Sequence, residues 1–143
     1  MDIKKLKSIT KKLNAIYIED SRCVSKVSME LFEDIFNRVD LAEDGLSALK
    51  KYKNSKYDLV LSDINLPKMN GLEVIKKILT IDDKQAIVII SAYSEIEYFS
   101  IMQEMNIKYF LKKPVNSKSL FKTIYESIEH LEKEADERLV TID

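Results

Sequence analysis

The sequence predicts an α/β fold in which a parallel five-stranded sheet is covered by helices on both faces. Three observations favour this class: short apolar runs alternate with helical patterns, several runs lack strict polar alternation, and the few glycines and prolines lie between the elements. The length of 143 residues suits one domain. A chain of this size buries about 68% of its unfolded surface.

The five apolar runs, rich in Val, Ile, Leu and aromatic residues, are predicted to be strands. They cover residues 15–19, 38–42, 58–63, 86–91 and 108–112. The intervening segments carry apolar residues at three-to-four spacing, which is typical of amphipathic helices. Five helices are predicted, over residues 21–36, 45–52, 72–79 and 95–105, and from Ser117 onwards. Such alternation implies right-handed crossovers, and we expect the doubly wound, flavodoxin-like strand order 2-1-3-4-5.

Two segments flank the predicted core, which spans residues 15–131. Residues 1–14 are a basic N-terminal extension whose weak apolar stripe would fit one or two helical turns. Residues 132–143 are a charged C-terminal helical extension or linker. The apolar rhythm leading into it resembles a heptad seam but is too short to predict a coiled coil. A stand-alone protein and a piece of a longer one both stay open.

The composition excludes several classes of function. With 23 basic and 24 acidic residues the net charge is −1, which argues against direct nucleic-acid binding. The single cysteine, Cys23, cannot form an internal disulfide and permits a reducing compartment. No apolar stretch approaches the roughly 20 residues needed to span a bilayer, and no signal peptide is recognisable. We therefore expect a cytoplasmic protein without membrane contact.

Residues with reactive or charged side chains follow four of the predicted strands. Glu19 ends the first strand and Asp20 follows it, Asp63 ends the third, Ser91 ends the fourth, and Lys113 follows the fifth. In the order 2-1-3-4-5 the first and third strands are neighbours, and open sheets bind ligands beyond the carboxyl ends at this point. The three carboxylates should therefore meet, with Ser91 and Lys113 beside them.

Such a group of side chains suits a metal-assisted phosphoryl acceptor. Three crowded carboxylates repel one another, and Mg²⁺ is usually held by one or two carboxylates together with water and phosphate. Phosphoryl transfer needs mostly positioning and charge neutralisation. We expect Asp20 and Asp63 to bind the cation, Glu19 to orient metal-bound water, and Lys113 and Ser91 to contact the phosphoryl group.

The sequence around these residues resembles the response-regulator receiver domain of two-component signalling, of the chemotaxis-regulator type. The matching segments are Ile18-Glu19-Asp20-Ser21, Ala42-Glu43-Asp44-Gly45 with Ala48-Leu49, residues 61–73, Ile90-Ser91-Ala92 and Lys113-Pro114. The resemblance implies that Asp63 accepts a phosphoryl group from a sensor histidine kinase or a histidine phosphotransfer protein. It also implies Mg²⁺, with Mn²⁺ as an alternative ion, and a signalling module that catalyses only its own phosphorylation and dephosphorylation.

Further roles follow from the resemblance alone. Asp20, Asp63 and the backbone carbonyl of Asn65 would bind Mg²⁺ directly, and Glu19 would bind it through water. Ser91 would be the switch hydroxyl, Phe110 the switch aromatic residue, and the Lys113–Pro114 peptide bond would be cis. The phosphoryl state would change the surface of the fourth predicted helix, fifth strand and fifth helix, and so control an output domain or another partner; a homodimer is left open. Glu19, Ser91 and Phe110 stand where Asp, Thr and Tyr are commoner, and the positions of Asn65 and Tyr93 resemble those that tune dephosphorylation.

Three alternatives compete with this interpretation. An aspartyl-nucleophile phosphohydrolase needs a second acid two residues after the nucleophile, where this chain has Asn65. A flavin site would need a phosphate-binding loop rich in Ser, Thr and Gly after the first strand, whereas Glu19-Asp20 repels phosphate unless a metal intervenes. A phosphorylation-independent interaction adaptor with the same fold stays open. His130 lies between Glu129 and Glu132 and is rejected as a phosphorelay histidine.

Overall fold

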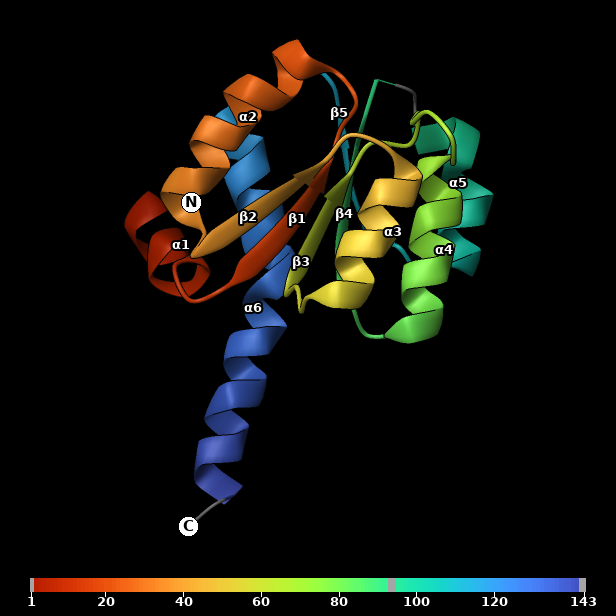
Figure 1. The fold of residues 1–143 in the computed structure, drawn as a ribbon. Helices are drawn as coiled ribbons and strands as arrows, with labels where there is room; N and C mark the ends of the chain where they lie inside the picture. Colours follow the sequence, from red (N-terminus) through yellow and green to blue (C-terminus); the bar gives the residue numbers. More distant parts are fainter. Residues whose placement is uncertain (1, 93–94, 142–143) are drawn as a thin grey trace.

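The fold is a central parallel sheet with helices packed on both faces (Figure 1). The computed structural model describes residues 2–92 and 95–141, without the side chains of residues 95–97, 130 and 132–141. The strands are β1 (Asn14–Ile18), β2 (Arg38–Ala42), β3 (Leu59–Ser62), β4 (Ala86–Ser91) and β5 (Tyr109–Lys112). They are parallel in the order β2-β1-β3-β4-β5, so the predicted fold class and strand order are confirmed.

Six helices are present in the described part of the chain, where five were predicted. They are α1 (Ile3–Thr10), α2 (Arg22–Ile35), α3 (Gly45–Asn54), α4 (Gly71–Ile81), α5 (Glu95–Glu104) and α6 (Ser117–Thr141). The additional helix is α1, in the segment expected to form only a helical turn or two. Side-chain oxygens accept hydrogen bonds from orphan backbone N–H groups at four helix starts, with Asp2, Ser21, Asp44 and Asn70 as the N-cap residues.

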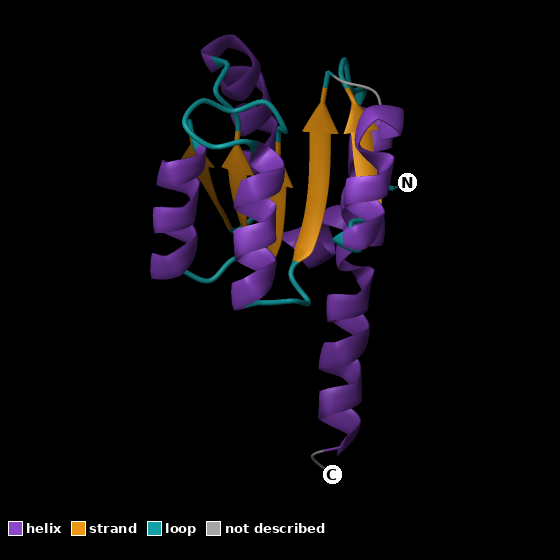
Figure 2. Ribbon diagram, turned by 90° about the vertical axis from the view of Figure 1, so that its right-hand side faces the viewer, coloured by secondary structure: helices purple, strands orange, loops and turns teal. Residues whose placement is uncertain are grey.

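The core has two layers, one on each face of the sheet. Because side chains alternate along a strand, Ile16 and Ile18 face the layer beneath α3, α4 and α5, whereas Ala15 and Tyr17 face the layer beneath α1, α2 and α6. Figure 2 shows helices on either side of the strands. Every residue of β3 and β4 is buried, which explains why these runs read as continuously apolar in the sequence.

The register of the sheet brings the ends of the strands to one edge. Ile18 pairs with Ala42 on one side and with Ser62 on the other, and Ser91 pairs with Lys112. Backbone hydrogen bonds continue this ladder one residue further: the Asp63 N–H donates to the Ile18 carbonyl at 3.0 Å. The residues that follow β1, β3 and β5 therefore emerge beside one another.

The C-terminal helix α6 packs against the sheet and then projects away from the domain (Figure 1). Leu120, Ile124 and Ile128 in its first half are buried. Among the described helices, none has the combination of length and apolar composition that crossing a membrane requires.

Candidate functional site

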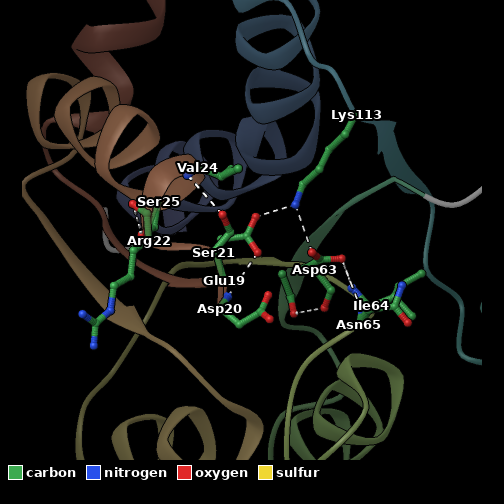
Figure 3. A network of polar contacts seen from close by, with 11 residues as sticks. Glu19, Asp20, Ser21, Arg22, Val24, Ser25, Asp63, Ile64, Asn65 and Lys113 are labelled. Carbon is green, nitrogen blue, oxygen red and sulfur yellow. Dashed lines mark hydrogen bonds and ion pairs between the residues drawn. The ribbon is translucent and has the colours of Figure 1, made fainter.

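Asp63 lies immediately after β3 and its carboxylate is held on both oxygens (Figure 3). Oδ1 accepts hydrogen bonds from the backbone N–H groups of Ile64, at 2.7 Å, and Asn65, at 3.3 Å. Oδ2 accepts a hydrogen bond from the Lys113 ammonium at 2.9 Å. The hydroxyl of Ser62, buried in the strand, donates to the Asp63 carbonyl at 2.8 Å. The carboxylate is therefore fixed in one orientation at the sheet edge.

The loop that follows Asp63 is closed tightly by Gly71. The Gly71 N–H donates to the Ile64 carbonyl at 2.6 Å. A Cβ atom at this position would collide with the Asp63 carbonyl oxygen and would lie 2.8 Å from the Ile64 Cα. Only glycine permits this approach of two backbone segments, because the obstructing atoms are themselves backbone and cannot turn aside. The loop between β3 and α4 thus fixes the backbone amides that hold Asp63.

Glu19 and Asp20, which follow β1, lie in different environments. Glu19 is only 1% exposed and contacts the Lys113 ammonium, and its Oε2 accepts a hydrogen bond from the Asp20 N–H at 3.1 Å. Burial raises the pKa of Glu19, although the hydrogen bond to Lys113 opposes that effect. Asp20 is exposed. One oxygen from each of Glu19, Asp20 and Asp63 lies within 4.8 Å of the others.

Lys113, the residue after β5, provides the positive charge of the site. Its ammonium contacts both Glu19 and Asp63, and the side chain is mostly buried. Burial alone would lower the pKa of Lys113, but the hydrogen bonds to Glu19 and Asp63 outweigh it and raise that pKa. One ammonium among three carboxylates leaves an excess of negative charge. A cluster of oxygen ligands with this excess fits a hard divalent cation such as Mg²⁺ or Mn²⁺.

The other predicted site residues lie around this centre. Ser91 is fully buried at the end of β4, and its carbonyl accepts a hydrogen bond from the Lys113 N–H at 2.8 Å. Phe110 on β5 is half-buried against the core layer beneath α3, α4 and α5. The Lys113–Pro114 peptide bond is cis, as predicted. Tyr93 and the side chain of His130 lie outside the described residues.

Ser62 and Gly71 support the site through contacts that are not among the predicted ones. The signal for Ser62 is a hydroxyl inside an otherwise apolar run, which indicates a buried hydrogen bond. Gly71 was interpreted only as a glycine between elements. Its close contact with the Asp63 backbone depends on how the loop folds back, which local sequence does not reveal.

Comparison with known proteins agrees with this geometry. Residues 15–125 match the family model described as the response regulator receiver domain. The chain is 33% identical over 112 residues to the chemotaxis protein CheY of Treponema pallidum, with 76% of this chain and 78% of that protein covered. It is 34% identical over 93 residues to the transcriptional regulatory protein ZraR of Klebsiella oxytoca, with 65% of this chain but only 21% of that protein covered.

Solved structures have the same fold. The receiver domain of a CheY-like protein from Methanospirillum hungatei superposes with a TM-score of 0.79 at 23% identity, covering 86% of this chain and 98% of that one. CheY in a CheX–CheY–BeF3–Mg complex from Borrelia burgdorferi gives a TM-score of 0.74 at 28% identity, with 80% and 87% covered. Receiver domains are signalling modules that bind Mg²⁺ in an acidic pocket and work with histidine kinases and output domains. By the match over most of its length, the chain belongs to the response-regulator receiver family of two-component signalling.

Proposed function

We propose that this receiver domain accepts a phosphoryl group on Asp63 from a histidine kinase or a histidine phosphotransfer protein. A carboxylate oxygen of Asp63 forms the new O–P bond, the N–P bond of the donor phosphohistidine breaks, and the released imidazole takes up a proton. The observation that carries the proposal is the juxtaposition of Asp63 with two more carboxylates and with the Lys113 ammonium, 2.9 Å from its Oδ2.

Each group has a role that its position supports. The Lys113 ammonium would neutralise negative charge on the phosphoryl oxygens, and Ser91, at the end of the neighbouring strand, would donate its hydroxyl to one of them. Asp20, Asp63 and the Asn65 carbonyl would hold Mg²⁺, with Glu19 acting through a water molecule. When bound, the cation supplies positive charge that offsets the repulsion between the acids and stabilises the transferring group.

We further propose that the phosphodonor docks on α2. This helix begins two residues after Asp20, so a protein that presents a phosphohistidine to Asp63 must cover its first turns. Val24 and Val27 are 38% and 71% exposed on this helix. An exposed pair of branched apolar side chains beside a charged site is suited to burial by a partner helix.

The phosphoryl group would then alter the surface formed by α5, β5 and α6, with Ser91 and Phe110 as switch residues, and so control an output domain or another partner. Whether a second copy of the chain is such a partner is decided by light scattering with and without beryllofluoride. The same proposal takes residues 15–131 as the receiver, with segments 1–14 and 132–143 preceding and following it in the sequence, and α1 of the first segment packs into the receiver core. A cytoplasmic location is supported by the single, exposed, unpaired cysteine, Cys23.

The alternatives find less support. Asn65 stands where a phosphohydrolase would need its general acid, and its backbone N–H donates to Asp63 Oδ1. An amide side chain cannot donate a proton to a leaving group in that role. A phosphorylation-independent adaptor would have no use for Glu19, a carboxylate that is buried at a desolvation cost and paired with Lys113.

The test is incubation of the protein with acetyl phosphate and Mg²⁺, followed by mass spectrometry and hydroxylamine treatment. We expect one added phosphoryl group that hydroxylamine removes, that requires Mg²⁺ and that is lost in Asp63→Asn. Asp83→Asn, which changes an exposed acid in the α4–β4 connection, should be modified like the wild type. An acid-stable, hydroxylamine-resistant phosphate on Asp63→Asn would contradict the proposal.

A further inference from the structure

The N-terminal helix α1 lies outside the family match, which begins at residue 15, yet it is packed into the domain. Leu6 and Thr10 are fully buried and Ile9 is almost so. Leu6 and Ile9 belong to the core layer that holds apolar residues of α2, its C-cap residue Phe36, and α6: Phe32, Ile35, Phe36, Leu120, Ile124 and Ile128. The helix is thus part of the core and not a loose extension.

Polar contacts tie α1 to both of its neighbours. The Lys7 ammonium lies 2.8 Å from Oδ2 of Asp34, near the end of α2. The Lys5 ammonium lies 5.2 Å from the ring centroid of Tyr125, on α6. After α1 the chain is anchored again, because the Asn37 N–H donates to the Leu13 carbonyl at 2.9 Å. The helix therefore connects the end of α2 to the middle of α6.

The part of helix α5 whose side chains are described, residues 98–104, packs less extensively. Among its described side chains, at residues 98–104, Met102 is the one that is buried. Phe99 and Ile101 are 49% and 46% exposed. Among the described side chains of α5, a shift would disturb the buried Met102 and the partly buried Tyr98, whereas a shift of α6 would disturb the layer that Leu6 and Ile9 fill. A phosphoryl group shifts a helix between two positions only by as much as it stabilises one position over the other. Because moving α5 disturbs less packing than moving α6, α5 is the helix that responds more readily.

We propose that α1 holds α6 in a fixed position against α2, so that phosphorylation moves α5 relative to an immobile α6. This inference rests on the function proposed above and specifies which part of the α5, β5 and α6 surface moves. A partner would then recognise the position of α5 against a constant reference. The segment of α6 that projects from the domain would keep one direction in both states (Figure 1).

Hydrogen–deuterium exchange of the full chain tests the proposal, with and without Mg²⁺ and beryllofluoride. In the wild type we expect the complex to change exchange in peptides of α5 and to leave residues 117–131 of α6 unchanged. In metal-free Leu6→Ala, exchange in this part of α6 should rise roughly 30-fold relative to β4, and α6 should now respond to beryllofluoride. Ser8→Ala changes an exposed residue of α1 and is the matched control.

A milder variant guards against loss of the fold in Leu6→Ala. The double change Lys5→Ala with Lys7→Ala removes the two polar contacts but keeps the apolar packing, and should raise α6 exchange by a smaller factor. The proposal is overturned if wild-type α6 responds to beryllofluoride as strongly as α5, or if both α1 variants leave α6 exchange unchanged. If beryllofluoride changes nothing around Asp63 in the wild type, the proposed function fails instead. The metal-free comparison of Leu6→Ala with the wild type then still decides whether α1 holds α6.

Discussion

Asp20→Asn isolates the charge repulsion within the site. Asp20 is exposed and, among the described residues, has no ion pair, whereas Glu19 and Asp63 share Lys113. Its carboxylate is repelled by two acids, and the Lys113 ammonium, which pairs with those acids and not with Asp20, offsets only part of that repulsion. Asparagine removes the charge and keeps nearly the same shape.

The magnitude follows from the geometry. The carboxylate oxygens of the three acids lie within 4.8 Å of one another. At that separation, with the dielectric constant of water, each pair repels by about 0.9 kcal/mol. Two pairs, screened at physiological salt, give about 1 kcal/mol, and attraction to the Lys113 ammonium reduces this value. Asp20→Asn should raise the free energy of unfolding of the metal-free protein by up to this amount.

Urea denaturation in the presence of EDTA measures the effect, and Asp83→Asn serves as the control for removal of an exposed acid. In about 1 M NaCl, where the Debye length is about 3 Å, the gain should shrink to roughly a third. Saturating Mg²⁺ should stabilise the wild type more than the variant, because the variant has lost one ligand. A destabilised metal-free variant, or a gain that salt does not reduce, would refute the electrostatic account.

Three further changes test other parts of the structure. Lys113→Met leaves Glu19 buried without its cation and should lower the free energy of unfolding by about 2–3 kcal/mol near neutral pH. This loss is smaller than the roughly 3–5 kcal/mol for breaking a fully buried ion pair, because Lys113 is partly exposed. The folded-state pKa of Glu19 is raised above its ordinary value of 4.5, so protonation of Glu19 stabilises the folded state as the pH falls through that raised pKa towards 4.5. Urea titrations should therefore show that Lys113→Met loses less unfolding free energy at acidic pH than near neutral pH. An equal loss at both pH values would contradict this role. Gly71→Ala places a methyl group against the Asp63 carbonyl and should cost about 1–3 kcal/mol or more and impair Mg²⁺ binding; unchanged thermal unfolding would count against the close contact. Leu6→Ala should cost about 2–5 kcal/mol in urea denaturation, and a change within error would mean that α1 does not contribute to the core.

Asp63→Asn gives a smaller gain than Asp20→Asn by the same reasoning. It relieves repulsion from Glu19 and Asp20 but also removes the charge that pairs with Lys113 at 2.9 Å. The two effects oppose each other, whereas Asp20→Asn breaks no ion pair and the lost repulsion dominates.

Local sequence signals are sufficient to predict the strands, most of the helices and the grouping of the reactive side chains. Apolar runs and three-to-four spacing are local signals, and parallel strands end at the same edge of a sheet, so residues following β1, β3 and β5 had to meet. The strand limits differ from the predicted ones by at most one residue: Glu19 and Asp63 fall just beyond strands that were expected to include them. At each position one last backbone hydrogen bond, from Glu19 to Ala42 and from Asp63 to Ile18, precedes the turn.

The arrangement of those side chains depends on tertiary packing and could not be predicted from local sequence. Glu19 is buried while its neighbour Asp20 is exposed, because successive residues leaving a strand point to opposite sides and only one side meets Lys113. The contact of Gly71 with the Asp63 backbone and the burial of α1 between α2 and α6 likewise join residues distant in the sequence. Periodicity reports which face of an element is apolar, but the neighbour that covers this face is selected by the packing of the whole chain.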